Sequence, residues 1–129
     1  MKIEHIALWC TDIERMRTFY CTHFGATSND LYVNARGFHS YFLTFPQGGC
    51  RIELMQRADI DASPTRRGFE LGLAHFDIEV GDRQTVLQLT EHLRSKGHPI
   101  ASEPRTTGDG YFEAAILDPE GNYVEISAT

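Results

Sequence analysis

The sequence predicts an α+β fold built from two tandem βαβββ modules, and three observations lead to this prediction. Strand-like runs and one segment with helical spacing follow each other in the order β-α-β-β-β, which begins again after a polar stretch. Equivalent residues recur at a nearly constant interval: His75 lies 70 residues after His5, and Glu125 lies 72 residues after Glu53. The expected divisions are module one over 1–57, a linker over 58–72 and module two over 73–129, together forming one domain.

The first module is expected to open with a strand over 3–9, where Ile6 and Leu8 alternate with more polar neighbours. Thr11-x-x-Glu14 has the form of a capping box and predicts that a helix begins there, and Gly25 is placed to end it. Further strands are predicted over 27–33, 39–45 and 51–56, separated by turn-type clusters.

The second module repeats this order. A strand over 73–80 is followed by a helix that Asp82 is placed to cap and that Gly97 ends. The last three strands are expected over 100–103, 111–117 and 123–127. The final two are joined by Asp118-Pro119-Glu120-Gly121-Asn122, a strong turn sequence.

Composition limits the partners. The chain has 129 residues, 41% of them hydrophobic, which suits one ordinary domain or two half-size modules that share a core. Twelve Lys and Arg against eighteen Asp and Glu give a net charge of −6, which disfavours nucleic acid and anionic membranes and favours a small molecule. The beginning of the sequence has no signal-peptide or transit-peptide pattern, so a cytoplasmic location is expected. Three cysteines without a C-x-x-C pair are expected to be reduced thiols.

Each module carries a His in its first strand and a Glu in its last: His5 and Glu53, then His75 and Glu125. Because side chains alternate along a strand, their apolar neighbours should face the helices, and these four residues should share the other face of the sheets. A lone strand His or Glu is most often a solvated or hydrogen-bonded residue. For four such residues at equivalent places in two copies of a module, that interpretation would require four coincidences. Two imidazoles and two carboxylates suit a divalent transition metal that acts as a Lewis acid on a substrate with oxygens on adjacent carbons.

These residues and several motifs resemble the vicinal oxygen chelate superfamily, which includes glyoxalase I, extradiol dioxygenases, fosfomycin-resistance proteins and metal-free bleomycin-resistance proteins. The resemblance covers nearly the whole chain and implies two βαβββ modules whose mixed sheets curl around a metal site. The motifs that carry it are His5-Ile6-Ala7 leading into Thr11-Asp12, Phe19-Tyr20 before Phe24-Gly25, Ala74-His75-Phe76, and Asp118-Pro119-Glu120-Gly121-Asn122-x-x-Glu125.

Within that superfamily the ligand set His, Glu, His, Glu is typical of glyoxalase I. The resemblance then implies a metal-dependent lyase or isomerase, similar to lactoylglutathione lyase, that acts on a small 2-oxo compound or a hemithioacetal through a metal-bound enediolate. Glu125 would be the ligand that also carries the proton, and Glu53 its catalytic counterpart. The implied cofactor is one divalent metal, Zn²⁺ or Ni²⁺ first and Co²⁺, Mn²⁺ or Fe²⁺ as alternatives, and the implied assembly is a homodimer.

Two departures from the bacterial glyoxalase I pattern affect the substrate. Trp9 stands where an Arg is typical, and Arg57 stands where a small Asn is expected, so the thiol need not be glutathione. The expected substrate-binding residues are Arg57 and Arg105 for an anionic group, with Trp9 and Tyr111 as pocket walls; Arg66 and Arg67 are further candidates for the anionic group.

Two alternative functions remain open at the level of sequence. One is a thiol transferase of the fosfomycin-resistance type, which would not need Glu53. The other is a metal-free protein that sequesters a ligand, as bleomycin-resistance proteins do. The sequence also leaves open whether the four ligands come from one chain or from two.

Overall fold

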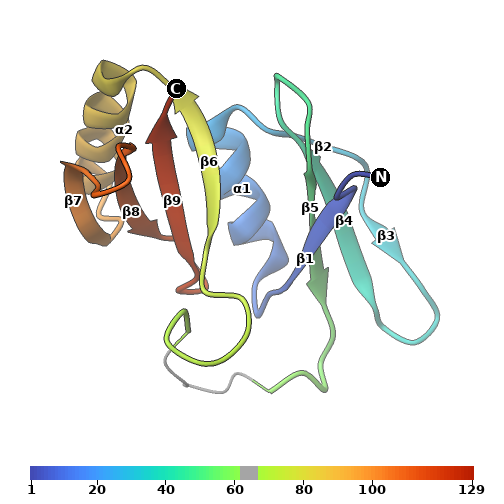
Figure 1. Cartoon of the computed structure of the whole chain (residues 1–129). Coiled ribbons are helices and arrows are strands. Elements are labelled where there is room, and N and C mark those ends of the chain that lie inside the picture. The colour runs from blue at the N-terminus through green and yellow to red at the C-terminus, as the bar shows by residue number, and fades with distance from the viewer. Residues whose placement is uncertain (62–66) are drawn as a thin grey trace. The chain divides into compact units, whose positions relative to one another are not determined.

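The computed structural model describes residues 1–61 and 67–129. The chain divides into two compact units, Met1–Ser63 and Pro64–Thr129, and each contains a sheet and one long helix (Figure 1). The prediction of an α+β fold with two modules is therefore confirmed. Neither helix among the described residues has the length and apolar character needed to cross a membrane.

Module one contains a helix and a mixed sheet. Its elements are β1 (His5–Trp9), α1 (Ile13–Phe24), β2 (Thr27–Ser28), β3 (Tyr32–Val33), β4 (His39–Thr44) and β5 (Arg51–Gln56). The strand order is β1-β5-β4-β2, with β3 also paired to β4. Strand β1 runs parallel to β5, and the other pairs are antiparallel. The first and last strands of the module are thus direct neighbours.

Module two has the same arrangement. Its elements are β6 (Phe76–Gly81), α2 (Arg83–Ser95), β7 (Ile100–Thr106), β8 (Phe112–Leu117) and β9 (Tyr123–Ala128). The order is β6-β9-β8-β7, again with the first strand parallel to the last and antiparallel pairs elsewhere. The duplication inferred from residue spacing is therefore also a duplication of topology.

The helix of each module covers one face of its own sheet. The neighbours of Glu53 along β5, Ile52 and Leu54, are at most 2% exposed. The neighbours of Glu125 along β9, Val124 and Ile126, are fully buried. Because alternate residues of a strand face opposite sides, both glutamates lie on the sheet face that the helix does not cover, as predicted.

The start of α1 differs from the prediction. Asp12, not Thr11, is the N-cap: its side chain accepts a 2.9 Å hydrogen bond from the backbone N–H of Arg15. The expected partner of Thr11 in a capping box, Glu14, instead accepts a hydrogen bond from the hydroxyl of Tyr41 on β4. The end of the helix is as predicted, since Gly25 has a φ of 65° in the left-handed region.

The strand expected over 27–33 is two separate strands of two residues each. At Asn29, which lies between them, the side-chain oxygen accepts a hydrogen bond from the N–H of Phe42 at 2.7 Å, while the Asn29 N–H still donates to the Phe42 carbonyl at 3.3 Å. The first strands also begin later than expected, at His5 and at Phe76. His5 is therefore the first residue of its strand and His75 immediately precedes its own, whereas both were predicted in mid-strand.

Candidate metal centre

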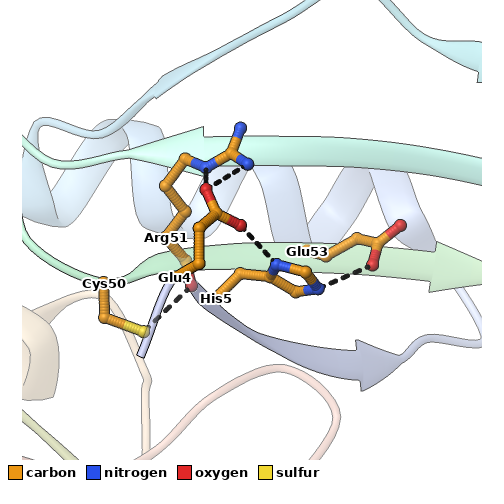
Figure 2. A network of polar contacts seen from close by, with 5 residues as sticks. All are labelled: Glu4, His5, Cys50, Arg51 and Glu53. Atoms are coloured by element: carbon orange, nitrogen blue, oxygen red, sulfur yellow. Dashed lines mark hydrogen bonds and ion pairs between the residues drawn. The ribbon is translucent and has the colours of Figure 1, made fainter. Parts of the chain in front are cut away.

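In module one the parallel pairing of β1 with β5 brings His5 and Glu53 together. Ala7 is the register partner of Glu53, so His5 lies diagonally across from that carboxylate on the same face. The Nε2 of His5 is 3.6 Å from the Oε2 of Glu53 (Figure 2). The Glu53 side chain is only 16% exposed.

Module two repeats this geometry. Asp77 is the register partner of Glu125, and His75 precedes Asp77 by two residues, just as His5 precedes Ala7. The Nε2 of His75 is 3.1 Å from the Oε2 of Glu125. Each predicted ligand pair is therefore assembled within its own module.

Both pairs have a spacing that suits ligands of one divalent ion. Two donors at right angles, each about 2.1 Å from a metal, lie roughly 3.0 Å apart, and tetrahedral donors lie roughly 3.4 Å apart. The observed nitrogen–oxygen separations of 3.1 and 3.6 Å are close to these values. Among residues 1–61 and 67–129, no group of three or more His, Cys, Asp or Glu side chains is placed to hold a metal ion. Each module thus brings one imidazole and one carboxylate together.

The imidazole of His5 is held by further contacts. Its Nδ1 lies 2.5 Å from a carboxylate oxygen of Glu4, and the other oxygen of Glu4 accepts from the Nε of Arg51 at 2.7 Å (Figure 2). The guanidinium of Arg51 stacks over the ring of Phe42, at 4.3 Å from its centroid, and Phe42 packs edge-on against His5. The hydrogen bond with His5 lowers the pKa of the Glu4 carboxyl.

The second pair lies among charged residues. Burial is the main reason that the pKa of Glu125 is raised; the nearby carboxylates of Glu113 and Asp77 raise it further, while His75 and Arg105 oppose the shift. Arg105 is 3.3 Å from the carboxylate of Glu113, which shows that the arginine lies on this face. Glu125 is therefore a carboxylate that holds a proton more readily than an exposed one.

The turn before β9 positions Glu125. Asp118 is 4% exposed, and its carboxylate accepts hydrogen bonds from the backbone N–H groups of Glu120 and Asn122 and from the Asn122 amide, at 2.8–3.0 Å. Arg67 donates to the carbonyl of Glu120 and to the Asn122 side chain. This turn fixes where β9 begins and hence which residues face away from α2.

Comparison with known proteins places the chain in a family. The model of the Glyoxalase/Bleomycin resistance protein/Dioxygenase superfamily matches residues 2–126. The chain belongs to this superfamily. The resemblance inferred from the sequence motifs is confirmed.

Three proteins illustrate a similarity that is low in sequence and, for the solved structures, high in fold. An uncharacterized protein of Bacillus subtilis, YqjT, is 24% identical over 129 residues, covering 98% of both proteins. A glyoxylase/bleomycin resistance protein/dioxygenase domain from Frankia has a TM-score of 0.84 at 15% identity, covering 99% of this chain and 91% of that one. The trypanothione-dependent glyoxalase I of Leishmania major has a TM-score of 0.78 at 21% identity, covering 99% and 86%. At these identities the solved structures establish the shared superfamily fold.

The four predicted substrate-binding residues differ from one another in their surroundings. The guanidinium of Arg57 stacks on Trp9, 5.4 Å from the ring centroid, and forms an ion pair with Asp59. Arg105 lies on the face of Glu125, as described above. Tyr111, in the hairpin between β7 and β8, has an exposed ring and uses its carbonyl to accept from Thr107. Among the further candidates, Arg67 supports the turn before β9, and Arg66 lies outside the described residues.

Four residues of the two sites were not predicted from the sequence: Glu4, Arg51, Asp77 and Glu113. Strand alternation contained a signal for two of them, since Arg51 is two residues from Glu53 and Asp77 is two residues from His75. Glu113 needed the register of β8 with β9. Glu4 could not be predicted, because a residue next to His5 in a continuous strand would face the helix. Strand β1 begins at His5, so Glu4 precedes the strand and its side chain can reach the imidazole.

Proposed function

We propose that this superfamily member is a divalent-metal-dependent lyase or isomerase of the glyoxalase I type. Its substrate would be a small 2-oxo compound or a hemithioacetal, which includes a glutathione adduct. We propose that His5, Glu53, His75 and Glu125 together hold one ion, Zn²⁺ or Ni²⁺ first, and that the protein acts as a homodimer.

The observation that carries this proposal is the repeated pairing of an imidazole with a carboxylate at a metal-compatible separation. The two pairs occupy equivalent places in the two modules, and their distances of 3.6 and 3.1 Å both suit adjacent ligands. Neutral imidazole and carboxylate donors match the preferences of Zn²⁺ and Ni²⁺ better than those of Mg²⁺ or Ca²⁺. A metal-free sequestering protein would have no need of this arrangement.

The chain's own residues would divide the work as follows. Glu125 would take a proton from the carbon beside the substrate carbonyl and return it to the neighbouring carbon, because a carboxylate on the open sheet face beside His75 is placed to act as a general base. Glu53 would hold the ion from the opposite module. Arg105 would pair with an anionic group of the substrate. When bound, the metal would supply Lewis-acid stabilisation of negative charge on the substrate oxygens.

The first test combines metal analysis with an activity assay. Protein purified without chelator, then reconstituted with Ni²⁺ or Zn²⁺, is assayed for methylglyoxal consumption with and without glutathione. We expect about one equivalent of metal and an activity that falls by roughly 10²- to 10⁴-fold in Glu125→Gln. Glu103→Gln is a matched control, since it removes an exposed carboxylate that pairs with Arg94 on the helix side of module two.

The outcomes separate the candidate functions. Less than about a tenth of an equivalent of metal, not recovered on adding Ni²⁺ or Zn²⁺, would contradict the enzyme proposal and favour ligand sequestration. Full metal binding in Glu53→Gln would favour the thiol transferase alternative. Metal binding without methylglyoxal turnover would move the substrate away from methylglyoxal and its thiol adducts.

A further inference from the structure

The two histidines differ in what supports them, although their pairing with glutamate is equivalent. Behind His5 stands the carboxylate of Glu4, which bridges the imidazole and the Arg51 guanidinium (Figure 2). The duplication places Ala74 at the position of Glu4 and Tyr123 at that of Arg51. Within the described part of module two, no carboxylate contacts the Nδ1 of His75.

The contacts around His5 form a closed ring of four side chains. Glu4 accepts from His5 and from Arg51, Arg51 covers the face of Phe42, and Phe42 meets the edge of the imidazole at a centroid distance of 5.3 Å. The backbone N–H of Arg51 also donates to the carbonyl of Glu4, which fixes the two residues to each other. This ring leaves the imidazole little freedom to rotate.

The hydrogen bond also determines which nitrogen carries the proton. A carboxylate at Nδ1 accepts a hydrogen bond, so Nδ1 must be the protonated nitrogen of the neutral imidazole. The Nε2 then presents its lone pair toward Glu53. Metal-ligating histidines generally donate their second N–H to a carboxylate or a carbonyl, and this raises their basicity and fixes their orientation.

We propose that Glu4, held by Arg51, is a positioning residue that fixes His5 as the Nδ1-protonated tautomer with Nε2 directed at the Glu53 side. Module one would then hold its histidine in a fixed orientation for the metal, whereas the histidine of module two has no equivalent carboxylate among the described residues. The expected effect of Glu4 on metal affinity rests on the proposed function, whereas its effect on the His5 tautomer does not require metal.

The first experiment uses the metal-free protein. Long-range ¹H–¹⁵N spectra of the side chains, recorded at about pH 8.5 where imidazoles are neutral, report the tautomer of each histidine. We expect Nδ1 protonation at His5 in the native protein and loss of that tautomer in Glu4→Ala. Glu103→Ala is the matched control, because it removes a glutamate whose side chain also pairs with one arginine. An unchanged His5 tautomer in Glu4→Ala overturns the proposal.

The second experiment measures the metal affinity of the full-length protein by competition with a chromophoric chelator, using Zn²⁺. We expect Glu4→Ala to weaken Zn²⁺ binding by roughly 10- to 100-fold, with Glu4→Gln intermediate and Glu103→Ala unchanged. Arg51→Met, which releases Glu4 without touching His5, should weaken binding less than Glu4→Ala. Zn²⁺ affinity in Glu4→Ala within about twofold of the native protein overturns the proposal. Native protein that binds no Zn²⁺ contradicts the proposed function instead, and the tautomer then decides the role of Glu4.

Discussion

At the scale of single residues, Asp118 is a polar side chain outside the His–Glu pairs that accepts several hydrogen bonds. It is nearly buried, and its two oxygens organise the turn that delivers β9 and hence Glu125. We expect Asp118→Ala to lower the free energy of unfolding by roughly 2–3 kcal/mol, since it leaves backbone donors without their acceptor. Urea unfolding followed by circular dichroism measures this.

The hairpin before β8 offers a control for Asp118. Asp109 also accepts a hydrogen bond within a turn, from the hydroxyl of Thr107, but its side chain is exposed. Asp109→Ala should change the free energy of unfolding by less than about 0.5 kcal/mol. Equal losses in the two variants would show that burial of the Asp118 turn is not what stabilises β9.

The sequence singled out the four candidate ligands because they repeat, but it did not predict how they pair. Spacing along the chain indicated that His5 corresponds to His75 and Glu53 to Glu125. It did not indicate that the first strand of each module lies beside the last, which is what brings each His next to its own Glu. That strand pairing depends on hydrogen bonds between segments far apart in sequence. The alternation of residues within one strand does not predict which strands pair.

At the scale of elements, the two helices begin with aspartates that serve the same purpose. Asp12 accepts from the N–H of Arg15, and Asp82 accepts from the N–H of Thr85 at 2.8 Å. The sequence identified Asp82 but favoured Thr11 for the first helix. Both Thr11 and Asp12 are residue types that cap helices, and the pattern alone does not decide between adjacent candidates.

The assignment of the cap to Asp12 can be tested by stability. Asp12→Ala should lower the free energy of unfolding by about 1 kcal/mol, because the N–H of Arg15 loses its acceptor. Asp12→Asn retains a capping oxygen and should stay within a few tenths of a kcal/mol of the native protein. Urea unfolding of the three proteins measures both. A loss in Asp12→Asn as large as in Asp12→Ala would indicate that the charge near the helix terminus, and not the hydrogen bond, matters.

The hydrogen bonds of Asp82 lead us to expect that the free energy of unfolding depends on pH. Hydrogen bonds from the backbone and hydroxyl of Thr85 lower the pKa of Asp82 in the folded state. The stabilisation by its charge is therefore present above the unfolded pKa of about 3.9 and is lost as the pH falls through the lower folded value. The difference in unfolding free energy between the native protein and Asp82→Asn should shrink as the pH falls below about 4. Urea unfolding at a series of pH values measures it, and a constant difference contradicts the prediction.

At the scale of the whole molecule, the two modules share their strand topology but differ in the side chains around their His–Glu pairs. Each module pairs its first and last strands in parallel and places a His–Glu pair at the same register. Around these pairs, however, module one has Arg51 and Phe42, and module two has Asp77 and Glu113. The two halves share the His–Glu pairs and the backbone that orients them, while the flanking residues differ. This is why repeat spacing predicted the fold and singled out the residues of the His–Glu pairs, but did not predict the residues around them.

The proposed sharing of one ion by two modules predicts a stoichiometry. If all four ligands are needed, the native protein binds one Zn²⁺ per chain, and either His5→Ala or His75→Ala weakens that binding at least 10-fold. If each pair instead held its own ion, the native protein would bind two, and each variant would retain one of them at native affinity. Equilibrium dialysis with elemental analysis distinguishes the two results. Two equivalents per chain would contradict the shared centre.

Mixing the two histidine variants then tests whether a centre uses modules of one chain or of two. In a homodimer whose centres each combine module one of one protomer with module two of the other, a mixed dimer of His5→Ala and His75→Ala contains one intact centre. Random exchange at equal concentrations makes about half the dimers mixed, so about a quarter of the centres should regain native Zn²⁺ affinity. Centres confined to single chains regain none, because every chain lacks one ligand. Recovery after co-refolding, but not after simple mixing at low temperature, would show that the protomers exchange only through unfolding.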